Sequence, residues 1–212
     1  MEVKLLTSPY SFHEMERFAA LAALTCHANT KKEHVPHEVL GRIIKAGHES
    51  ILEHITLTYS VKGLSRACLQ ELARHRHISL SVESTRHTLR KNVNNPEWWH
   101  RAIEGMSEDS FRAYMAVKKK FLTGLLANIP DARDDELKYF LPEMWPTNLI
   151  LTSNIRELRH IIKLRTNPAA LNEFRVLAYS LFEAVPESFK YLLEDCVYRE
   201  KSDYDAQKGG EA

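Results

Sequence analysis

The sequence predicts a helix-rich α+β fold, in which a small, mostly antiparallel sheet accompanies several amphipathic helices. Apolar residues recur at helical spacing along most of the chain, whereas strict alternation of apolar and polar residues is limited to a few short stretches. The 212 residues, 44% of them hydrophobic, suit one domain with a sizeable core. We therefore expect a single domain over residues 1–212, with a frayed tail from about residue 200.

The first two elements are expected to be helices. The stretch 11–14, Ser-Phe-His-Glu, has the form of a capping box and precedes apolar residues at helical spacing. It predicts a helix that runs to about residue 26. Pro36 favours the start of a second helix, which Gly47 ends.

A strand and a helix that leads into a charged stretch come next. Apolar and polar residues alternate from Ile55 to Val61, which predicts a strand that ends at Gly63. Residues 64–76 have helical spacing and place Cys68 on the apolar face, where we expect it in the core. Residues 78–83 alternate again and predict a short extended segment.

The rest of the chain is expected to be mostly helical. A loop over 91–99 leads to an amphipathic helix over about 107–128, whose lysines 118–120 are expected on a solvated face. In chain order we then expect a short helix over 131–140, a strand over 148–153, a helix over 154–165 with Arg159 off its apolar face, a long helix from Asn167-Pro168 to about 183, and another helix from Pro186.

Positive charge is concentrated in residues 74–91. Four arginines, three histidines and a lysine lie in these eighteen positions, against Glu83 as the one acidic residue. The whole chain has 29 Lys and Arg against 28 Asp and Glu, so bulk electrostatic binding of nucleic acid is not expected. Helix capping with surface ion pairs, an RNA-contacting loop, and a metal site formed by His75 and His77 remain open as alternatives.

A second cationic segment points to a bound anion. Asn154, Arg156, His160 and Arg165 place donors at fixed helical offsets, with Arg156 and His160 on one face. The chain contains neither a Walker sequence nor a G-x-G-x-x-G loop. If phosphates are bound, guanidinium groups rather than backbone nests must hold them.

The cysteines and the N-terminus bear on location. Cys26, Cys68 and Cys196 are far apart and form no C-x-x-C pair, which is typical of a reducing compartment. The first residues contain no apolar signal segment, and no apolar run has the length of a membrane span. We expect a soluble, cytoplasmic protein without membrane or nucleic-acid partners.

One pattern is more specific than these features. Residues 74–84, RHRHISLSVES, read Arg-His-Arg, seven residues, then Ser, with Arg86 soon after. This resembles the signature of the flavin-dependent thymidylate synthases. The block GHESILEH at 47–54 and the block SNIRELRHIIKLR at 153–165 stand where that family has supporting segments. The resemblance covers about residues 20 to 185.

The resemblance implies the family fold and a reaction. Family members methylate uracil C5 of dUMP to give dTMP, with methylenetetrahydrofolate as one-carbon donor and FAD reduced by NADPH as hydride source. It implies FAD contacts from Ser50, Arg74, His75, Arg76, Val82, Asn154, Ile155, Arg156 and His160. It implies dUMP contacts from Glu71, Arg74, Val82, Glu83, Ser84, Thr85, Arg86, Lys138 and Arg165, and no metal.

Arg165 is the residue to which the resemblance gives a catalytic role. It matches the family arginine that favours ionisation of uracil N3. A guanidinium is always charged, so beside N3 and O2 it stabilises the anion that makes C5 nucleophilic.

The sequence also departs from the family pattern. Ser81 and Val82 stand where Asn and Glu are usual, and Glu83 beside them faces the other way in an extended segment. Lys138 stands where the family often has an arginine. It keeps the positive charge but lacks the planar, forked guanidinium group. His160 replaces an asparagine. The usual glutamine corresponds to Glu71, with Gln70 next to it, and which of the two faces the nucleotide stays open.

Two questions of mechanism and assembly follow from the resemblance. Ser84 is either a nucleophile activated by His75 or a binding residue, and we favour binding because hydride transfer from a flavin needs no covalent adduct. The family builds its sites between the subunits of a homotetramer, and we expect the same here.

The rival interpretation is a non-catalytic nucleotide- or RNA-binding protein on the same scaffold, which Val82 favours.

Overall fold

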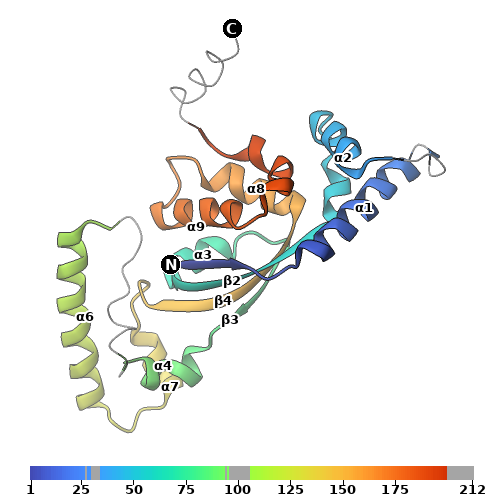
Figure 1. Ribbon diagram of the computed structural model, residues 1–212. Coiled ribbons are helices and arrows are strands. Elements are labelled where there is room, and N and C mark those ends of the chain that lie inside the picture. The colour runs from blue at the N-terminus through green and yellow to red at the C-terminus, as the bar shows by residue number, and fades with distance from the viewer. Residues whose placement is uncertain (27, 30–33, 94, 96–105, 200–212) are drawn as a thin grey trace. The chain divides into compact units, whose positions relative to one another are not determined.

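The computed structural model describes residues 1–26, 28–29, 34–93, 95 and 106–199. Helices predominate and strands are few, so the predicted helix-rich α+β class is confirmed (Figure 1). With η marking 3-10 helices, the elements are β1 (Glu2–Leu5), α1 (Pro9–Thr25), α2 (Pro36–Lys45), η1 (Glu49–His54), β2 (Thr56–Ser65), α3 (Arg66–Leu72), β3 (Ile78–Val82), α4 (Thr85–Val93), α6 (Glu108–Asn128), α7 (Asp134–Leu137), η2 (Lys138–Phe140), β4 (Pro146–Asn154), α8 (Ile155–Arg165), α9 (Asn172–Glu183), η3 (Glu187–Leu192) and η4 (Glu194–Cys196).

The chain forms two compact units. Unit 1 comprises Met1–Leu6 and Thr58–Thr152, and unit 2 comprises Thr7–Leu57 and Ser153–Ala212. Whether the two units make a single domain over 1–212, as the sequence predicts, stays a prediction. Within the part of the chain that the structure describes, no helix is both long and apolar enough to cross a membrane.

The sheet has the strand order β1-β2-β4-β3 (Figure 1). Strand β1, which the sequence did not predict, pairs antiparallel with β2 and places Val3 opposite Val61. The predicted end of β2 at Gly63 is wrong, because the strand continues to Ser65. Gly63 has φ +76°, a conformation that suits glycine, and its N–H donates to Asn148 Oδ1 on β4 at 3.0 Å.

Helix α3 is shorter than predicted and ends at Leu72. The Ser65 side chain caps it by accepting from Cys68 N, and Cys68 is fully buried, as expected. Arg74, His75 and Arg76 therefore follow the helix rather than forming its last turn.

Unit 1 has a small core that includes Val93, a residue of the segment predicted as a loop. Leu89 and Val93 on α4 pack with Leu122 on α6, Leu137 on α7 and Trp145. Helix α4 covers residues 91–93, so that part of the predicted 91–99 loop is wrong; residues 94 and 96–99 lie outside the described residues.

The prediction that lysines 118–120 all lie on a solvated face is wrong for Lys118. Its exposed fraction is 3%, whereas Lys119 and Lys120 are exposed. The Nζ atom of Lys118 lies 5.3 Å from the ring centres of both Tyr114 and Trp145. Burial lowers the pKa of Lys118 from 10.5 to about 8.

In unit 2, helix starts differ from those predicted. Helix α1 begins at Pro9, and Ser8 rather than Ser11 is the cap, since the Ser8 side chain accepts from Ser11 N. Helix α2 ends at Lys45, and Gly47 follows it with φ +72°, as predicted. Helix α9 begins at Asn172, not at Asn167-Pro168, because the Asn167 side chain accepts from Ala169 N and forms a local turn.

Arg159 is the second buried cation that the sequence missed. It is 4% exposed. Its guanidinium donates to both carboxylate oxygens of Asp195 at 2.7 Å and to Glu49 Oε1 at 3.0 Å. Burial raises the pKa of Asp195, but the bonds from Arg159 outweigh burial and hold this pKa below its ordinary value. This network joins α8 to η1 and η4.

Candidate functional site

The predicted nucleotide contacts of unit 1 lie at the start of α4. Ser84 is half-buried, Thr85 is buried and Arg86 is exposed, so the three side chains differ in their access to solvent. Helix α4 packs against α7 and η2, which places Lys138 on a neighbouring element. Lys138 is exposed, with its Nζ 5.6 Å from the ring centre of Tyr139.

Arg86 has an acidic neighbour on α7. Its Nε lies 3.7 Å from Asp135 Oδ1, and both side chains are about half exposed. An ion pair this long and this exposed contributes little stability. The guanidinium therefore remains accessible to a phosphate, which binds the fork of an arginine more strongly.

Glu83 is engaged within the protein. Its Oε1 accepts from Asn92 Nδ2 at 2.8 Å, and its Oε2 accepts from Asn148 Nδ2 at 2.6 Å. Val82 and Ser81, the two departures from the family pattern, are exposed. The carboxylate next to the site thus turns toward α4 and β4 and not toward the side on which Val82 lies.

The residues after α3 supply guanidinium groups. Arg74 and Arg76 are exposed, whereas His75 is 6% exposed. The backbone N–H of His75 donates to Leu72 O at 3.0 Å. Gln70 and Glu71 have different partners, and which of the two faces the nucleotide stays a prediction. Glu71 Oε1 lies 3.6 Å from Arg74 Nη1, whereas the Gln70 amide donates to Glu143 at 3.3 Å. Glu71 is thus the residue that accompanies Arg74.

In unit 2 the predicted flavin contacts cluster where η1 packs against α8. Asn154 caps α8 by accepting from Glu157 N at 2.8 Å, and Ile155 N donates to Ile55 O at 2.8 Å. Arg156 is about half exposed and forms an ion pair with Glu53 on η1. Ser50, on the same 3-10 helix, is exposed.

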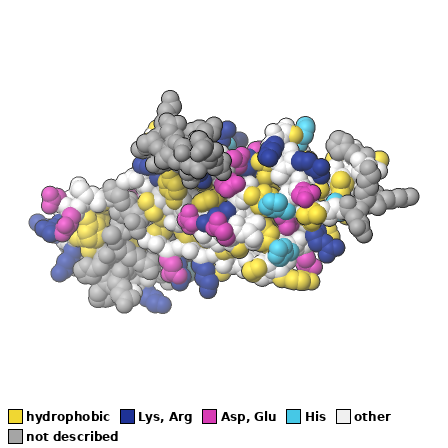
Figure 2. All heavy atoms as spheres, turned by 45° about the horizontal axis from the view of Figure 1, so that its top comes forward, with side chains coloured by type: hydrophobic (Ala, Val, Ile, Leu, Met, Phe, Trp, Pro, Cys, Tyr) yellow, Lys and Arg dark blue, Asp and Glu magenta, His cyan; other side chains and the backbone are white. Residues whose placement is uncertain are grey.

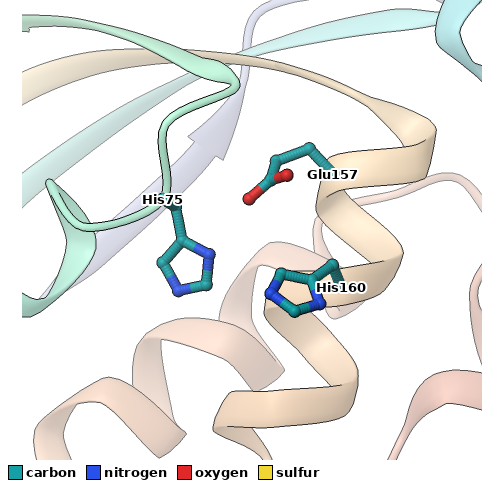
Figure 3. Close-up of side chains that lie close together, drawn as sticks. All are labelled: His75, Glu157 and His160. Carbon is teal, nitrogen blue, oxygen red and sulfur yellow. The ribbon is translucent and has the colours of Figure 1, made fainter.

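His160 lies on α8 next to an unpredicted carboxylate. Figure 3 shows Glu157 and His160 on the same helix, three residues apart, and His75 on the loop after α3. Glu157 is 9% exposed and His160 is exposed. Glu157 and His160 offer one carboxylate and one imidazole to a ligand of unit 2. In unit 1, His75 is buried while His77 is exposed, so the two imidazoles differ in their access to solvent.

Arg165 is held by an aromatic ring. Its guanidinium carbon lies 4.5 Å from the ring centre of Phe174, which is fully buried in α9. Contact with the face of a buried ring is a favourable cation–π interaction for the guanidinium. Arg165 is half-buried at the last position of α8.

Sequence reasoning missed Asn92 and Asn148, which hold Glu83. Asn92 belongs to the polar run 91–95, KNVNN, which is typical of a loop, and Asn148 opens an apolar strand. No local pattern indicates that two amides 56 residues apart bind one carboxylate. On the face drawn in Figure 2, basic and acidic side chains are intermixed, as the net charge of +1 suggests.

Comparisons with known proteins agree with the pattern in the sequence. The Thy1 family, described as thymidylate synthase complementing protein, matches residues 8–189. A flavin-dependent thymidylate synthase of Campylobacter jejuni strain RM1221 is 37% identical over 213 residues, covering 94% of this chain and 99% of the relative. One from Wolinella succinogenes is 37% identical over 190 residues, covering 85% and 93%. A crystal structure of thymidylate synthase X from Helicobacter pylori with FAD and dUMP is similar with a TM-score of 0.79 and 31% identity, covering 94% of this chain and 100% of that chain.

Proposed function

The chain belongs to the Thy1 family and is a flavin-dependent thymidylate synthase, and from this premise we propose that it methylates dUMP to dTMP with bound FAD. The one-carbon unit comes from methylenetetrahydrofolate, and NADPH reduces the flavin. Bound and reduced, FAD supplies the hydride. The observation that carries the proposal is the complete Arg-His-Arg to Ser signature, which leads directly into helix α4.

The start of α4 is suited to the phosphate of dUMP. The first backbone N–H groups of a helix have no partner within the helix, and the helix dipole favours an anion there. Arg86 adds an exposed guanidinium in the first turn, and Lys138 adds an ammonium from the adjacent η2. Lys138 acts as a point charge, because an ammonium lacks the planar fork of arginine.

Ser84 acts in binding. It is half-buried at the entry to α4, and the Thr88 side chain donates to its carbonyl at 3.1 Å. A serine at this position can donate to, or accept from, a nucleotide group without forming a covalent bond. The hydride supplied by FAD makes a covalent enzyme–uracil adduct unnecessary.

Arg165 promotes the chemistry at uracil. Its charge is permanent, and its guanidinium lies over the buried Phe174 ring. Beside N3 and O2 of uracil it stabilises the anionic form of the base, in which C5 is more nucleophilic. For this reason Arg165 is the proposed catalytic residue.

The donors expected at FAD fit a dinucleotide. A flavin diphosphate needs cationic hydrogen-bond donors, and Arg74, Arg76 and Arg156 all present exposed guanidinium groups. Ser50 adds a hydroxyl from η1, the element that packs against α8. Asn154, Ile155, His75, His160 and Val82 complete the proposed flavin set, and Glu71 accompanies Arg74 at the nucleotide.

We propose that the enzyme is a cytoplasmic homotetramer with its sites at subunit interfaces. A chain of 212 residues without a Gly-rich loop must hold a dinucleotide, a nucleotide and a folate. Residues from several chains meet this demand more readily than those of one chain.

Spectroscopy and nucleotide binding test the proposed function together. Purified protein incubated with excess FAD and then desalted should keep a flavin absorption band in the blue. Addition of dUMP to this flavoprotein should perturb the band and give saturable binding by calorimetry. A protein that retains no flavin, or a flavoprotein that does not bind dUMP, would contradict the proposal.

A further inference from the structure

Glu83 lies between the elements that carry the proposed nucleotide contacts. It follows β3 directly and precedes Ser84 and α4. Its backbone N–H donates to Asn148 O at 2.8 Å. Its two carboxylate oxygens accept separately, from Asn92 at 2.8 Å and from Asn148 at 2.6 Å. One residue is thus tied to β4 twice and to α4 once.

The Asn148 amide is itself held in one orientation, and Asn92 is buried. Asn148 Oδ1 accepts from Gly63 N at 3.0 Å, so turning the amide around would lose that bond. The Asn148 nitrogen therefore has to face Glu83. Asn92 is 7% exposed and lies near the far end of α4. From Thr85 to Asn92 the helix rises about 10 Å, so the clamp links Glu83, two residues before the helix, to the last turn of the helix.

We propose that Glu83 is a positioning residue for the nucleotide: its carboxylate clamps α4 to β4 and thereby holds Ser84, Thr85 and Arg86 against the phosphate of dUMP. The inference rests on the proposed function, because the phosphate is that of its substrate. It assigns Glu83 an indirect role in place of the direct contact expected from the resemblance. The negative charge matters, since a carboxylate only accepts hydrogen bonds and both amides donate.

The isosteric change Glu83→Gln tests the clamp with little change in volume. A glutamine offers one oxygen and one NH2, so its nitrogen must face one of the two donating amides. With FAD-saturated enzyme, the dissociation constant of dUMP should rise about ten-fold, which corresponds to about 1.4 kcal/mol. The KM for dUMP should rise with it, while kcat at saturating dUMP stays within about three-fold.

Replacing Asn92 distinguishes a positioning role of Glu83 from direct contact between Glu83 and the nucleotide. It is buried on α4, outside the proposed set of substrate contacts, so Asn92→Ala should weaken dUMP binding as Glu83→Gln does. The double variant should be no worse than either single variant, because both changes break the same clamp. If Asn92→Ala does not fold, Asn92→Ser at the same position replaces it. Glu108→Gln, an exposed carboxylate on α6 paired with Arg112, is the matched control and should leave dUMP binding unchanged.

The outcomes distinguish this inference from the proposed function. If the unaltered flavoprotein does not bind dUMP, the proposed function fails. If it binds dUMP and Glu83→Gln leaves the KM unchanged, the clamp has no positioning role. If Glu83→Gln weakens binding but both folded Asn92 variants do not, Glu83 contacts the nucleotide directly and the inference is wrong. A loss of kcat alone, with an unchanged KM, would indicate a purely structural residue and would also overturn it.

Discussion

Replacing the buried Lys118 by methionine should stabilise the protein at neutral pH. The pKa of Lys118 is lowered by burial from 10.5 to about 8, so the folded protein carries this charge at pH 7 at a cost. Linkage between the two pKa values makes that cost about 3 kcal/mol. The rings of Tyr114 and Trp145, each 5.3 Å from Nζ, offset about 1 kcal/mol of it. Methionine keeps the apolar length of the side chain, so Lys118→Met should gain stability, by at most about 2 kcal/mol.

The sign and the pH window of this effect follow from the direction of the shift. Between about pH 8 and 10.5 the unfolded chain binds a proton at Lys118 that the folded chain has released. The cost of the buried charge therefore falls as pH rises, and the advantage of Lys118→Met should shrink to under about 1 kcal/mol at pH 10. Burial raises the pKa of Tyr114 to about 12, so this phenol stays neutral across the window.

Urea unfolding of FAD-saturated protein at pH 7 and pH 10, followed by far-ultraviolet circular dichroism, measures the difference. Lys119→Met is the matched control, because Lys119 is the exposed neighbour on the same helix and its replacement should change little at either pH. A Lys118→Met protein that is less stable than the original at pH 7, or a gain that does not fall with pH, would refute the reasoning.

Three further predictions concern the site. Arg165→Ala should keep flavin but lose dUMP methylation, with about 1.5–3 kcal/mol lost in nucleotide binding, and Arg165→Lys should recover only part; near-normal turnover of the alanine variant would contradict the role given to Arg165. Ser84→Ala should retain measurable methylation with weaker dUMP affinity, whereas complete loss of turnover with intact flavin and nucleotide binding would indicate a nucleophile. Arg86→Ala and Arg165→Ala, each inactive alone, should restore a minor but clear fraction of dTMP formation when co-assembled; verified subunit exchange with activity at background would place both arginines in one chain's site.

Periodicity predicted the elements that bury a regular apolar face. Helices α2 and α8 and the core of β2 follow from it, because their apolar residues recur at fixed spacing. Helix α4 was missed because its sequence, TRHTLRKNV, is almost entirely polar, and only Leu89 and Val93 reach the small core of unit 1. Tertiary packing, not local pattern, makes this segment helical.

Long-range partners account for the other misses. Burial of Arg159 depends on Asp195, 36 residues further along the chain, and no local rule predicts that pair. Lys118 lies over the ring of Trp145, which comes from a distant segment. The sequence around Lys118 shows only three consecutive lysines, a pattern typical of a solvated face. The Asn92–Glu83–Asn148 clamp is of the same kind. By contrast, the arginines proposed for the site were predicted from the sequence, because the signature at 74–84 and the block at 153–165 place them at fixed spacing.

The central claim is that this chain uses a flavin to replace the hydrogen at uracil C5 of dUMP by a methyl group. The most direct test is release of tritium from dUMP labelled at C5, measured with methylenetetrahydrofolate and NADPH, with and without FAD. We predict release that requires FAD, that is matched by dTMP formation, and that is lost in Arg165→Ala. Protein that binds FAD and dUMP but releases no tritium under these conditions would contradict the claim and would favour a non-catalytic nucleotide-binding protein.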